Sequence, residues 1–156
     1  MDDRLIQEVR TEASKKINRN LVLDIMGTDI DARMVEIAKE NAQKAGVASD
    51  ITFKQMRVQD LRSDKINGVI ISNPPYGERL SDDAGVTKLY AEMGEVFEPL
   101  KTWSKFILTS DENFEKKFGR QADKKRKLYN GTLKVDLYQF FGERVRRQAT
   151  SEKGNI

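Results

Sequence analysis

Hydrophobic positions recur along the chain with two different periods, and the two periods alternate. Apolar residues spaced three and four apart predict helices, whereas short runs rich in β-branched residues predict strands. The predicted helices cover 3–18, 32–45, 86–100 and 113–118; the predicted strands cover 21–30, 51–56, 68–72 and 103–109, and a terminal hairpin lies within 127–141. This order predicts an α/β protein with a mostly parallel sheet, to which the hairpin adds an antiparallel strand.

The first two predicted helices are amphipathic. In the first, one stripe is apolar and we expect it to face the core: Leu5, Ile6, Val9, Ala13 and Ile17. In the second, Asp31 is a good N-cap and Gly46 a good C-terminal stop. The second helix also places a set of apolar residues on one face: Met34, Ile37, Ala38, Ala42 and Ala45.

The predicted strand at 68–72 ends in the sequence Asn73-Pro74-Pro75-Tyr76. The first proline removes an amide donor and both prolines fix φ, so the turn is stiff and ends the strand. In open α/β sheets the carboxyl ends of the strands are where ligands bind. The alternative interpretation is a plain strand-terminating turn with a surface tyrosine.

This turn offers groups that suit attack by an exocyclic amino group of a nucleobase. That nitrogen is a poor nucleophile because its lone pair is delocalised into the ring. The Asn73 side-chain oxygen and the Pro74 carbonyl would hold its two N–H groups and aim the lone pair, which is catalysis by positioning and electrostatics. Tyr76 would stack on the base.

Acidic residues follow two of the other predicted strands. Asp31 is explained by its capping role. Asp29, near the carboxyl end of the predicted strand at 21–30, has no such explanation. An acidic residue at that place in a nucleotide-binding α/β unit commonly accepts the ribose hydroxyls of a cofactor. Asp60 follows the strand at 51–56 and would accept from an adenine amino group, although an aspartate there is more often a turn former.

Composition excludes several mechanisms. The chain has no cysteine and no histidine, which excludes a thiolate zinc site, a cysteine nucleophile and histidine general-base schemes. Charged residues make up 34% of its 156 residues, and no apolar run is long enough to cross a bilayer. We therefore expect a cytoplasmic protein with no metal and no membrane association.

The positive charge is concentrated near the carboxyl end. The net charge of +3 is only a weak indication of nucleic-acid binding. Seven basic residues, however, fall within one short segment: Lys116, Lys117, Arg120, Lys124, Lys125, Arg126 and Lys127. A solvated charged loop and a surface that contacts phosphates are about equally good interpretations of this segment.

Four sequence segments together carry a family resemblance: GTDID, VQD, VIISNPPYGERL and KKRKLYNGTLKVDLYQFFG. They resemble class I S-adenosylmethionine-dependent methyltransferases, and more narrowly the bacterial large-subunit (23S) rRNA guanine-N2 methyltransferases, in which a THUMP RNA-binding domain precedes the catalytic one. The resemblance implies a Rossmann-like three-layer sandwich, S-adenosylmethionine as cofactor and RNA as substrate. NPPY is shared with adenine-N6 methyltransferases, so it indicates amino methylation without fixing the base.

The resemblance implies a role for each matching residue. Asp29 would hold the cofactor ribose with Ile30 beside the adenine, and Asp60 would accept from the adenine amino group with Gln59 next to it. In the turn, Asn73 and Pro74 would hold the target amine, Pro75 would shape the turn and Tyr76 would stack on the base. Transfer would be a direct displacement at the sulfonium methyl group.

The sequence departs from the family pattern at its amino end. No GxG pair occurs among its ten glycines and nothing strand-like precedes Leu21, so we expect the first strand, the glycine-rich loop and the THUMP domain to be missing. We expect a partial catalytic domain at 1–142 and a disordered basic tail at 143–156. A fragment of this kind would bind the cofactor weakly and have little activity. The alternatives are an adenine-N6 methyltransferase and a non-catalytic RNA-binding module.

Overall fold

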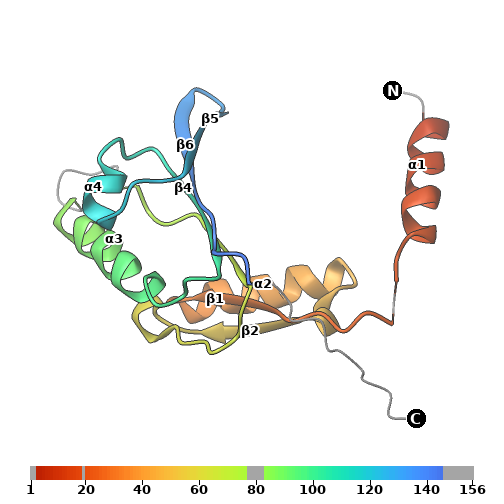
Figure 1. Cartoon of the computed structure of the whole chain (residues 1–156). Helices are drawn as coiled ribbons and strands as arrows, with labels where there is room; N and C mark the ends of the chain where they lie inside the picture. Colours follow the sequence, from red (N-terminus) through yellow and green to blue (C-terminus); the bar gives the residue numbers. More distant parts are fainter. Residues whose placement is uncertain (1–2, 19, 77–82, 146–156) are drawn as a thin grey trace, which may run out of the picture. The chain divides into compact units, whose positions relative to one another are not determined.

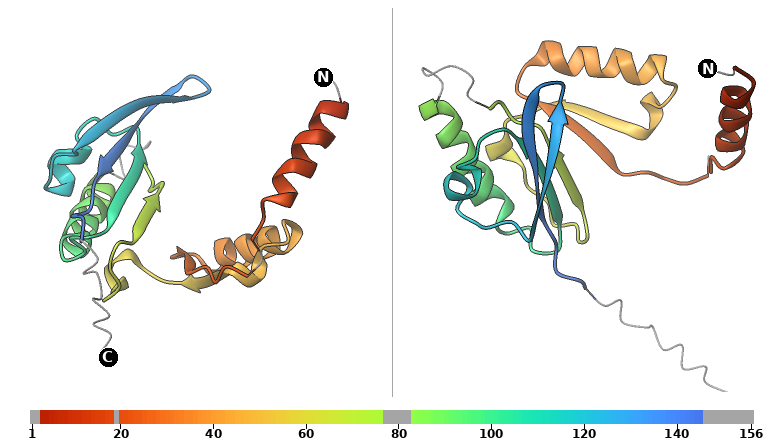
Figure 2. Two further views of the ribbon diagram at one scale, coloured as in Figure 1. Left: turned by 45° about the vertical axis from the view of Figure 1, so that its right-hand side comes forward. Right: turned by 90° about the horizontal axis from the view of Figure 1, so that it is seen from above.

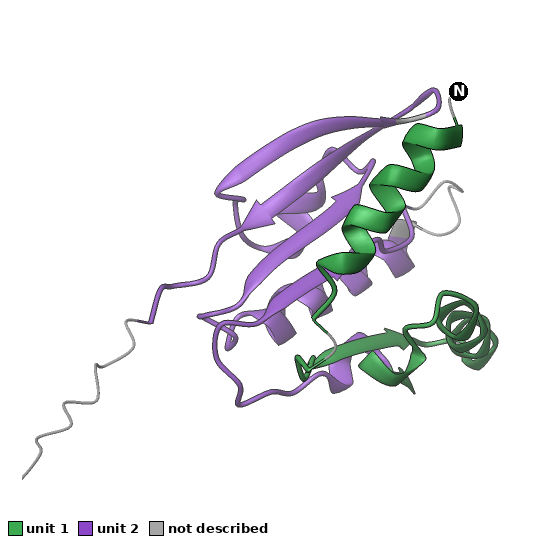
Figure 3. Ribbon diagram, turned by 90° about the vertical axis from the view of Figure 1, so that its right-hand side faces the viewer, with its two compact units in different colours: residues 1–56 green, residues 57–156 purple. Residues whose placement is uncertain are grey.

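The computed structural model describes residues 3–18, 20–76 and 83–145. The chain divides into two compact units, Met1–Met56 and Arg57–Ile156 (Figure 3). Helices and strands alternate along both units (Figure 1), as the hydrophobic pattern predicts.

Unit 1 contains a parallel pair of strands joined through a helix. Its elements are α1 (Asp3–Lys15), β1 (Ile25–Asp29), α2 (Ala32–Lys44), the short 3-10 helix η1 (Ala48–Asp50) and β2 (Ile51–Gln55). The two strands pair in register from Ile25↔Ile51 to Asp29↔Gln55. Helix α2 packs on both strands, which gives the βαβ arrangement predicted for this part of the chain.

The ends of α2 follow from local chemistry. The Asp31 side chain accepts a hydrogen bond from the Arg33 amide at 2.9 Å, which confirms the predicted N-cap. At the other end Gly46 has a φ of +71°. The Val47 amide donates to the Ala42 carbonyl and the Gly46 amide to the Gln43 carbonyl, both at 3.0 Å. This pair of bonds is a Schellman motif, and it explains why the helix stops where glycine allows a left-handed residue.

One expectation about burial in unit 1 is wrong. The apolar stripe of α1 is not buried: Leu5 is 60% and Val9 59% exposed. In α2 the buried residues are Val35 and Ala42, while Met34 and Ile37, which belong to the apolar face named above, are exposed. An amphipathic pattern identifies the face that a helix can bury, but burial also needs a complementary surface. Helix α2 has one in β1 and β2, whereas α1 has no buried residue among those that the structure describes.

Unit 2 contains a four-stranded mixed sheet with two helices. Its elements are η2 (Val58–Asp60, a 3-10 helix), β3 (Val69–Ser72), α3 (Asp83–Phe97), β4 (Ser104–Thr109), α4 (Phe114–Phe118), β5 (Lys124–Asn130) and β6 (Leu133–Phe140). The strand order is β3-β4-β6-β5; β3 and β4 are parallel, and both pairings of β6 are antiparallel. The predicted terminal hairpin is therefore present.

The core of unit 2 is aromatic. Phe114 of α4 lies at its centre, with ring centroids 4.9 Å from Tyr90 and 4.7 Å from Tyr138. Helices α3 and α4 approach so closely at Gly94 that a Cβ there would lie 2.1 Å from the Phe118 carbonyl oxygen. This close approach explains a glycine in the middle of a long helix.

The basic segment and the ends of unit 2 require corrections. Residues Lys124–Lys127 do not form a loop, because they are the first half of β5. Helix α3 begins at Asp83, three residues before the predicted start at 86. The predicted disordered tail also lies largely outside the described residues, so that expectation stays a prediction.

Candidate functional site

The Asn73–Tyr76 turn follows β3 directly. Strand β3 pairs in parallel with β4 from Val69↔Ser104 to Ser72↔Ile107, so both strands end at the same edge of the sheet. Pro74 is buried, whereas Asn73 and Pro75 are exposed. Because the prolines cannot continue the ladder, the chain leaves the sheet at this point and presents Asn73 at the carboxyl end of β3.

A series of hydrogen bonds that runs through the core supports this turn. Tyr90 of α3 is fully buried, and its hydroxyl donates to the Pro75 carbonyl at 2.9 Å. A hydroxyl has a single hydrogen, so the 2.9 Å contact between Tyr90 and Thr109 Oγ1 has the threonine as donor. Thr109 Oγ1 in turn accepts from the Asp111 amide at 3.1 Å. Burial raises the pKa of the Tyr90 phenol, so the phenol stays protonated as the donor to Pro75.

Within the turn, the Tyr76 hydroxyl donates to Asn73 Oδ1. This bond fixes the Asn73 amide and the Tyr76 ring relative to each other. A carbonyl-type oxygen has two lone pairs, so Asn73 Oδ1 can accept a second hydrogen bond from a ligand. The arrangement therefore presents one oriented acceptor beside one half-buried aromatic ring.

Asp111, two residues after the end of β4, has a structural role that the sequence analysis missed. Its carboxylate accepts from Lys117 Nζ and from the Asn113 amide, each at 2.8 Å, and its carbonyl accepts from the Tyr138 hydroxyl at 3.2 Å. The Asp111 side chain is only 10% exposed. Because its oxygens are already engaged, Asp111 stabilises the loop beside the turn rather than offering a ligand site. No sequence signal beyond its place after a strand distinguished it.

In unit 1, Asp29 is the last residue of β1 and its side chain is exposed. Its Oδ1 accepts from the Asp31 amide at 2.8 Å, and its carbonyl accepts from the Met56 amide at 2.9 Å. Asp29 therefore closes the turn into α2, a role that its sequence position did not reveal. The next residue, Ile30, is 63% exposed. An exposed apolar side chain directly after a carboxylate suits a nucleoside, with its flat base and its hydroxyl groups.

Asp60 and Gln59 belong to η2 in unit 2. Gln59 Nε2 donates to Glu92 Oε2 of α3 at 2.5 Å, so its amide is engaged within the protein. Asp60 is exposed. The flanking residues Val58 and Leu61 pack against the aromatic core. Two apolar anchors and one side-chain bond thus fix a short helix that presents the Asp60 carboxylate to solvent.

The predicted site residues fall into two groups. Unit 1 contains Asp29 and Ile30, side by side at the carboxyl end of β1. Unit 2 contains the other six: Gln59, Asp60, Asn73, Pro74, Pro75 and Tyr76. Helix α3 connects those in unit 2, because Glu92 bonds to Gln59 and Tyr90 bonds to Pro75. Tyr90, which lies within the helix predicted at 86–100, is thus the main support of the turn.

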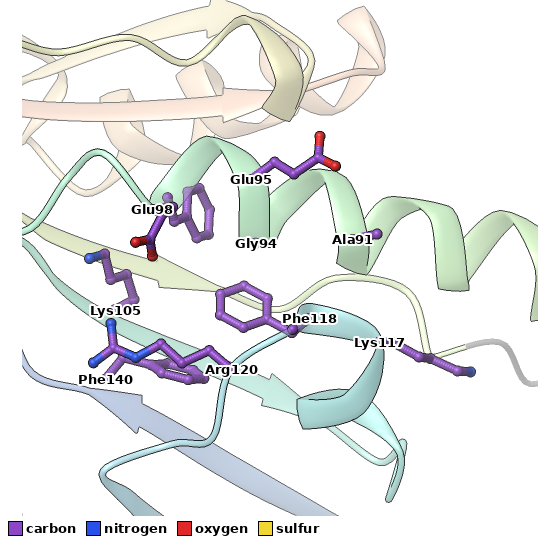
Figure 4. Close-up of a pocket in the computed structure, with 11 residues that line it drawn as sticks. Ala91, Gly94, Glu95, Glu98, Lys105, Lys117, Phe118, Arg120 and Phe140 are labelled. Carbon is purple, nitrogen blue, oxygen red and sulfur yellow. The ribbon is translucent and has the colours of Figure 1, made fainter.

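A pocket of about 350 Å³ lies elsewhere in unit 2, between α3, α4 and the sheet (Figure 4). One end carries the Glu98 carboxylate near the cations of Lys105 and Arg120. Lys105 is 4% exposed and its Nζ donates to the Leu100 carbonyl at 2.6 Å. Burial lowers the pKa of this lysine. None of the predicted site residues lines the pocket, so it is separate from the candidate site.

Among the described residues, no three acidic, histidine or cysteine side chains lie close enough together to bind a metal ion. No helix in the described part of the chain is long and apolar enough to cross a membrane.

Comparison with known proteins identifies the family. Residues 2–139 match the family model described as "RMKL-like, methyltransferase domain". The chain belongs to the RMKL-like methyltransferase family. This match confirms the family predicted from the NPPY turn and its flanking segments.

Relatives of this family share much of the chain but are longer. A Bacillus subtilis (strain 168) protein, YpsC, which is named as a candidate RNA methyltransferase, is 51% identical over 147 residues, covering 94% of this chain and 38% of its own. The ribosomal RNA large subunit methyltransferase K/L of Legionella pneumophila (strain Philadelphia 1) is 35% identical over 135 residues, covering 86% of this chain and 19% of its own. The chain therefore spans less than two fifths of the length of either relative.

A solved structure supports both the fold and the cofactor class. The crystal structure of SMU.472, described as a candidate methyltransferase complexed with SAH, is 62% identical and superposes with a TM-score of 0.84. The superposition covers 94% of this chain and 39% of the SMU.472 chain. The predicted Rossmann-like methyltransferase fold is thus confirmed. The RMKL-like methyltransferase family uses S-adenosylmethionine, whose product is the SAH bound in SMU.472.

The acceptor groups of this chain fit such a cofactor. Carboxylates accept hydrogen bonds from ribose hydroxyls and from an adenine amino group, and Asp29 and Asp60 are both exposed at the ends of their elements. Asp29 Oδ1 already accepts from a backbone amide, but a carboxylate has about four acceptor positions.

Proposed function

We propose that this chain supplies the catalytic residues of an S-adenosylmethionine-dependent methyltransferase that modifies the exocyclic amino group of a guanine in 23S rRNA. One observation carries the proposal: Asn73 lies exposed at the carboxyl end of β3, on a double-proline turn that Tyr90 supports from the core. Such a rigid acceptor is what a flat, weakly nucleophilic amine requires. We expect the protein to act in the cytoplasm.

In this proposal the turn does its work by positioning. The Asn73 side-chain oxygen and the Pro74 carbonyl accept the two N–H groups of the amine, which directs the nitrogen lone pair away from the base plane. Tyr76 stacks on the base, and Pro75 keeps the turn in shape. When bound, S-adenosylmethionine supplies an electrophilic methyl group, so the residues need to orient the amine rather than activate it covalently.

We further propose that Asp29 and Asp60 bind the cofactor. The Asp29 carboxylate would accept from the ribose hydroxyls, with Ile30 against the adenine ring. Asp60 would accept from the adenine amino group. Because the Gln59 side chain is bonded to Glu92, its contribution is to hold Asp60 in place.

We expect the 156-residue chain alone to bind the cofactor weakly and to have little activity. The chain covers only 38% of YpsC, and the glycine-rich segment that cradles the methionine end in class I methyltransferases has no counterpart in its sequence. Isothermal titration calorimetry with S-adenosylmethionine tests this expectation. Micromolar affinity for the chain alone would contradict it.

The experiment that tests the function uses a protein that carries these residues within the full length of its relatives. Transfer of a radiolabelled methyl group to 23S rRNA is measured for the wild type and for Asn73→Ala. We expect turnover to fall by about a hundredfold or more, as when one oriented polar group is removed from an active site, while RNA affinity is retained. Unchanged turnover in the variant would overturn the role of Asn73, and RNA binding without any methyl transfer by the wild type would favour a non-catalytic RNA-binding module.

The same assay separates guanine from adenine. NPPY also occurs in adenine-N6 methyltransferases, so the turn alone does not choose between them. Two oligonucleotides are compared, one in which guanine is the only purine and one in which adenine is the only purine. The substrate that is methylated identifies the target base. Methylation confined to the adenine substrate would replace guanine-N2 by adenine-N6 as the reaction.

A further inference from the structure

The β5–β6 hairpin ends at the same edge of the sheet as the Asn73 turn. Strand β4 is parallel to β3, β6 is antiparallel to β4, and β5 is antiparallel to β6. It follows that β5 runs in the same direction as β3, so its carboxyl end lies at the edge where β3 ends. Figure 2 shows the arrowheads of β3 and β4 directed toward the end of the sheet that carries the β5–β6 turn.

The hairpin also extends beyond its neighbour. Strand β4 pairs with β6 only as far as Thr109↔Asp136, whereas β5 pairs with β6 for three more residue pairs, to Asn130↔Leu133. At about 3.4 Å per residue, the tip projects roughly 10 Å past the end of β4. Three strand spacings of about 4.8 Å separate β3 from β5, so the tip lies about 14 Å to the side of the turn. A single-stranded nucleic acid crosses such a distance in a few nucleotides.

One face of the projecting hairpin carries an exposed tyrosine among lysines. Alternation along β5 places Tyr129 on the same face as Lys127, and the register places Lys134 opposite Tyr129. Tyr129 is 69% exposed. An exposed ring is a platform on which a base can stack, and the neighbouring ammonium groups suit phosphates. This combination is typical of sites that bind single strands.

Three cations of β5 are available for phosphates. Lys125 lies 4.0 Å from Asp136, and Lys134 lies 3.0 Å from Glu112. By contrast Lys124, Arg126 and Lys127 form no ion pair within the described part of the chain, and all three are exposed. Charges on an edge strand also prevent unwanted pairing between sheets. That role does not explain an exposed aromatic residue at the tip.

We propose that the β5–β6 hairpin binds the single-stranded RNA next to the target base, with Tyr129 stacked on a flanking base and Lys127, on the same face, on a phosphate. Lys124 and Arg126 alternate onto the other face of this edge strand and would contact phosphates where the RNA passes around the edge. This inference rests on the proposed function, since it places the target base at Asn73. It adds a binding surface outside the turn and predicts that the substrate is single-stranded for several nucleotides beside the modified base.

The test measures binding of the 156-residue chain to a fluorescently labelled single-stranded RNA by anisotropy, over a series of salt concentrations. We expect Tyr129→Ala to weaken binding about tenfold and Tyr129→Phe to change it little, because stacking needs the ring and not the hydroxyl. The double variant Arg126→Gln, Lys127→Gln should lower the slope of log affinity against log salt by about 2. The matched control, Lys15→Gln with Lys44→Gln, removes the same charge from the last turns of α1 and α2.

Each outcome decides the proposal. A loss restricted to the hairpin variants supports it. Equal losses in the hairpin and control variants would indicate general electrostatic attraction and overturn it, as would absence of salt-dependent RNA binding by the wild type. Self-association of the wild type is measured by sedimentation in the absence of RNA. If the wild type self-associates and the Arg126→Gln, Lys127→Gln variant does not, the hairpin would be a contact between copies of the chain and the proposal would be overturned. Circular dichroism verifies that each variant is folded.

The assay needs no methyl donor, so it can fail independently of the proposed function. If Asn73→Ala abolishes methyl transfer while the hairpin variants bind RNA normally, the function stands and the hairpin proposal fails. If the hairpin variants lose RNA binding and Asn73→Ala leaves methyl transfer unchanged, the hairpin binds RNA and the catalytic proposal fails.

Discussion

The buried hydroxyl of Tyr90 donates a hydrogen bond to the carbonyl oxygen of Pro75, at 2.9 Å. This one contact joins the longest helix of unit 2 to the turn that presents Asn73. The bond is the last of a series that begins at the Asp111 amide and passes through Thr109. The series ties the loops after β3 and β4 to the core, and it gives the turn a rigidity that prolines alone would not provide.

Tyr90→Phe should therefore destabilise the protein and loosen the turn. The substitution keeps the ring in the core but leaves the Pro75 carbonyl and the Thr109 hydroxyl without their partner. We expect the free energy of unfolding to fall by about 1–3 kcal/mol, measured by urea denaturation. Tyr129→Phe removes a hydroxyl from an exposed tyrosine and should change stability by less than about 0.5 kcal/mol. Equal stability of Tyr90→Phe and the wild type would show that the bond does not support the fold.

Two glycines of α3 should respond in opposite directions to substitution by alanine. A Cβ at Gly94 would lie 2.1 Å from the Phe118 carbonyl oxygen, which is backbone and cannot move aside easily. We expect Gly94→Ala to destabilise the protein by several kcal/mol, because α3 and α4 would have to separate. At Gly85, in the first turn of the same helix, a Cβ would meet nothing within 4 Å. Gly85→Ala should stabilise by up to about 1 kcal/mol through helix propensity.

Thermal denaturation of the two variants beside the wild type gives the measurement. A Gly94→Ala variant as stable as Gly85→Ala would mean that the two helices do not pack as closely as the structure has them.

Periodicity predicted most of the elements because each has a local cause. The β-branched run before Asn73 forms a strand, and Asp31 with Gly46 limits α2 through an N-cap and a Schellman motif. The turn itself was also predictable, because two prolines after an apolar run leave the chain few conformations. These features depend on residues close together in the sequence.

The rest depended on contacts between distant segments. Nothing in the sequence shows that the Tyr90 hydroxyl reaches Pro75, fifteen residues away, or that Gln59 bonds to Glu92 of α3. The basic residues of β5 were compatible with a solvated charged loop or with a phosphate-contacting surface, and neither interpretation predicted a strand at Lys124–Lys127. Pairing with β6 overrides the low strand propensity of lysine. The prediction that the apolar stripe of α1 faces the core was wrong for a related reason, because an amphipathic helix does not guarantee a partner surface.

Tyr138 should make the protein sensitive to alkaline pH. The side chain is fully buried, and burial raises the pKa of its phenol from 10.0 to about 12. Between these values the phenol ionises in the unfolded chain but remains neutral in the folded one. The stabilisation is therefore complete below pH 10 and is lost as the pH rises toward 12, with a slope of at most about 1.4 kcal/mol per pH unit.

Tyr138→Phe removes this titration. Urea denaturation at pH 8 to 11 should give a shallower loss of stability above pH 10 for the variant than for the wild type. At pH 8 the variant should be less stable by about 1 kcal/mol, because the hydrogen bond to the Asp111 carbonyl is lost. The lowered pKa of Lys105 acts in both proteins and cancels in the comparison. Parallel pH curves would show that Tyr138 does not titrate differently on folding.

Asp29→Asn can separate the structural role of this residue from its proposed role in cofactor binding. An asparagine oxygen can still accept the hydrogen bond that the Asp31 amide donates to Asp29 Oδ1, so the turn into α2 should remain and the unfolding free energy should change by less than about 0.5 kcal/mol. The amide lacks the charge and the second acceptor oxygen that two ribose hydroxyls require. In a protein of the relatives' full length, cofactor affinity measured by calorimetry should therefore fall about tenfold to a hundredfold. Asp50→Asn, in η1 of the same unit, is the control and should leave affinity unchanged; equal affinities for Asp29→Asn and the wild type would remove Asp29 from the cofactor site.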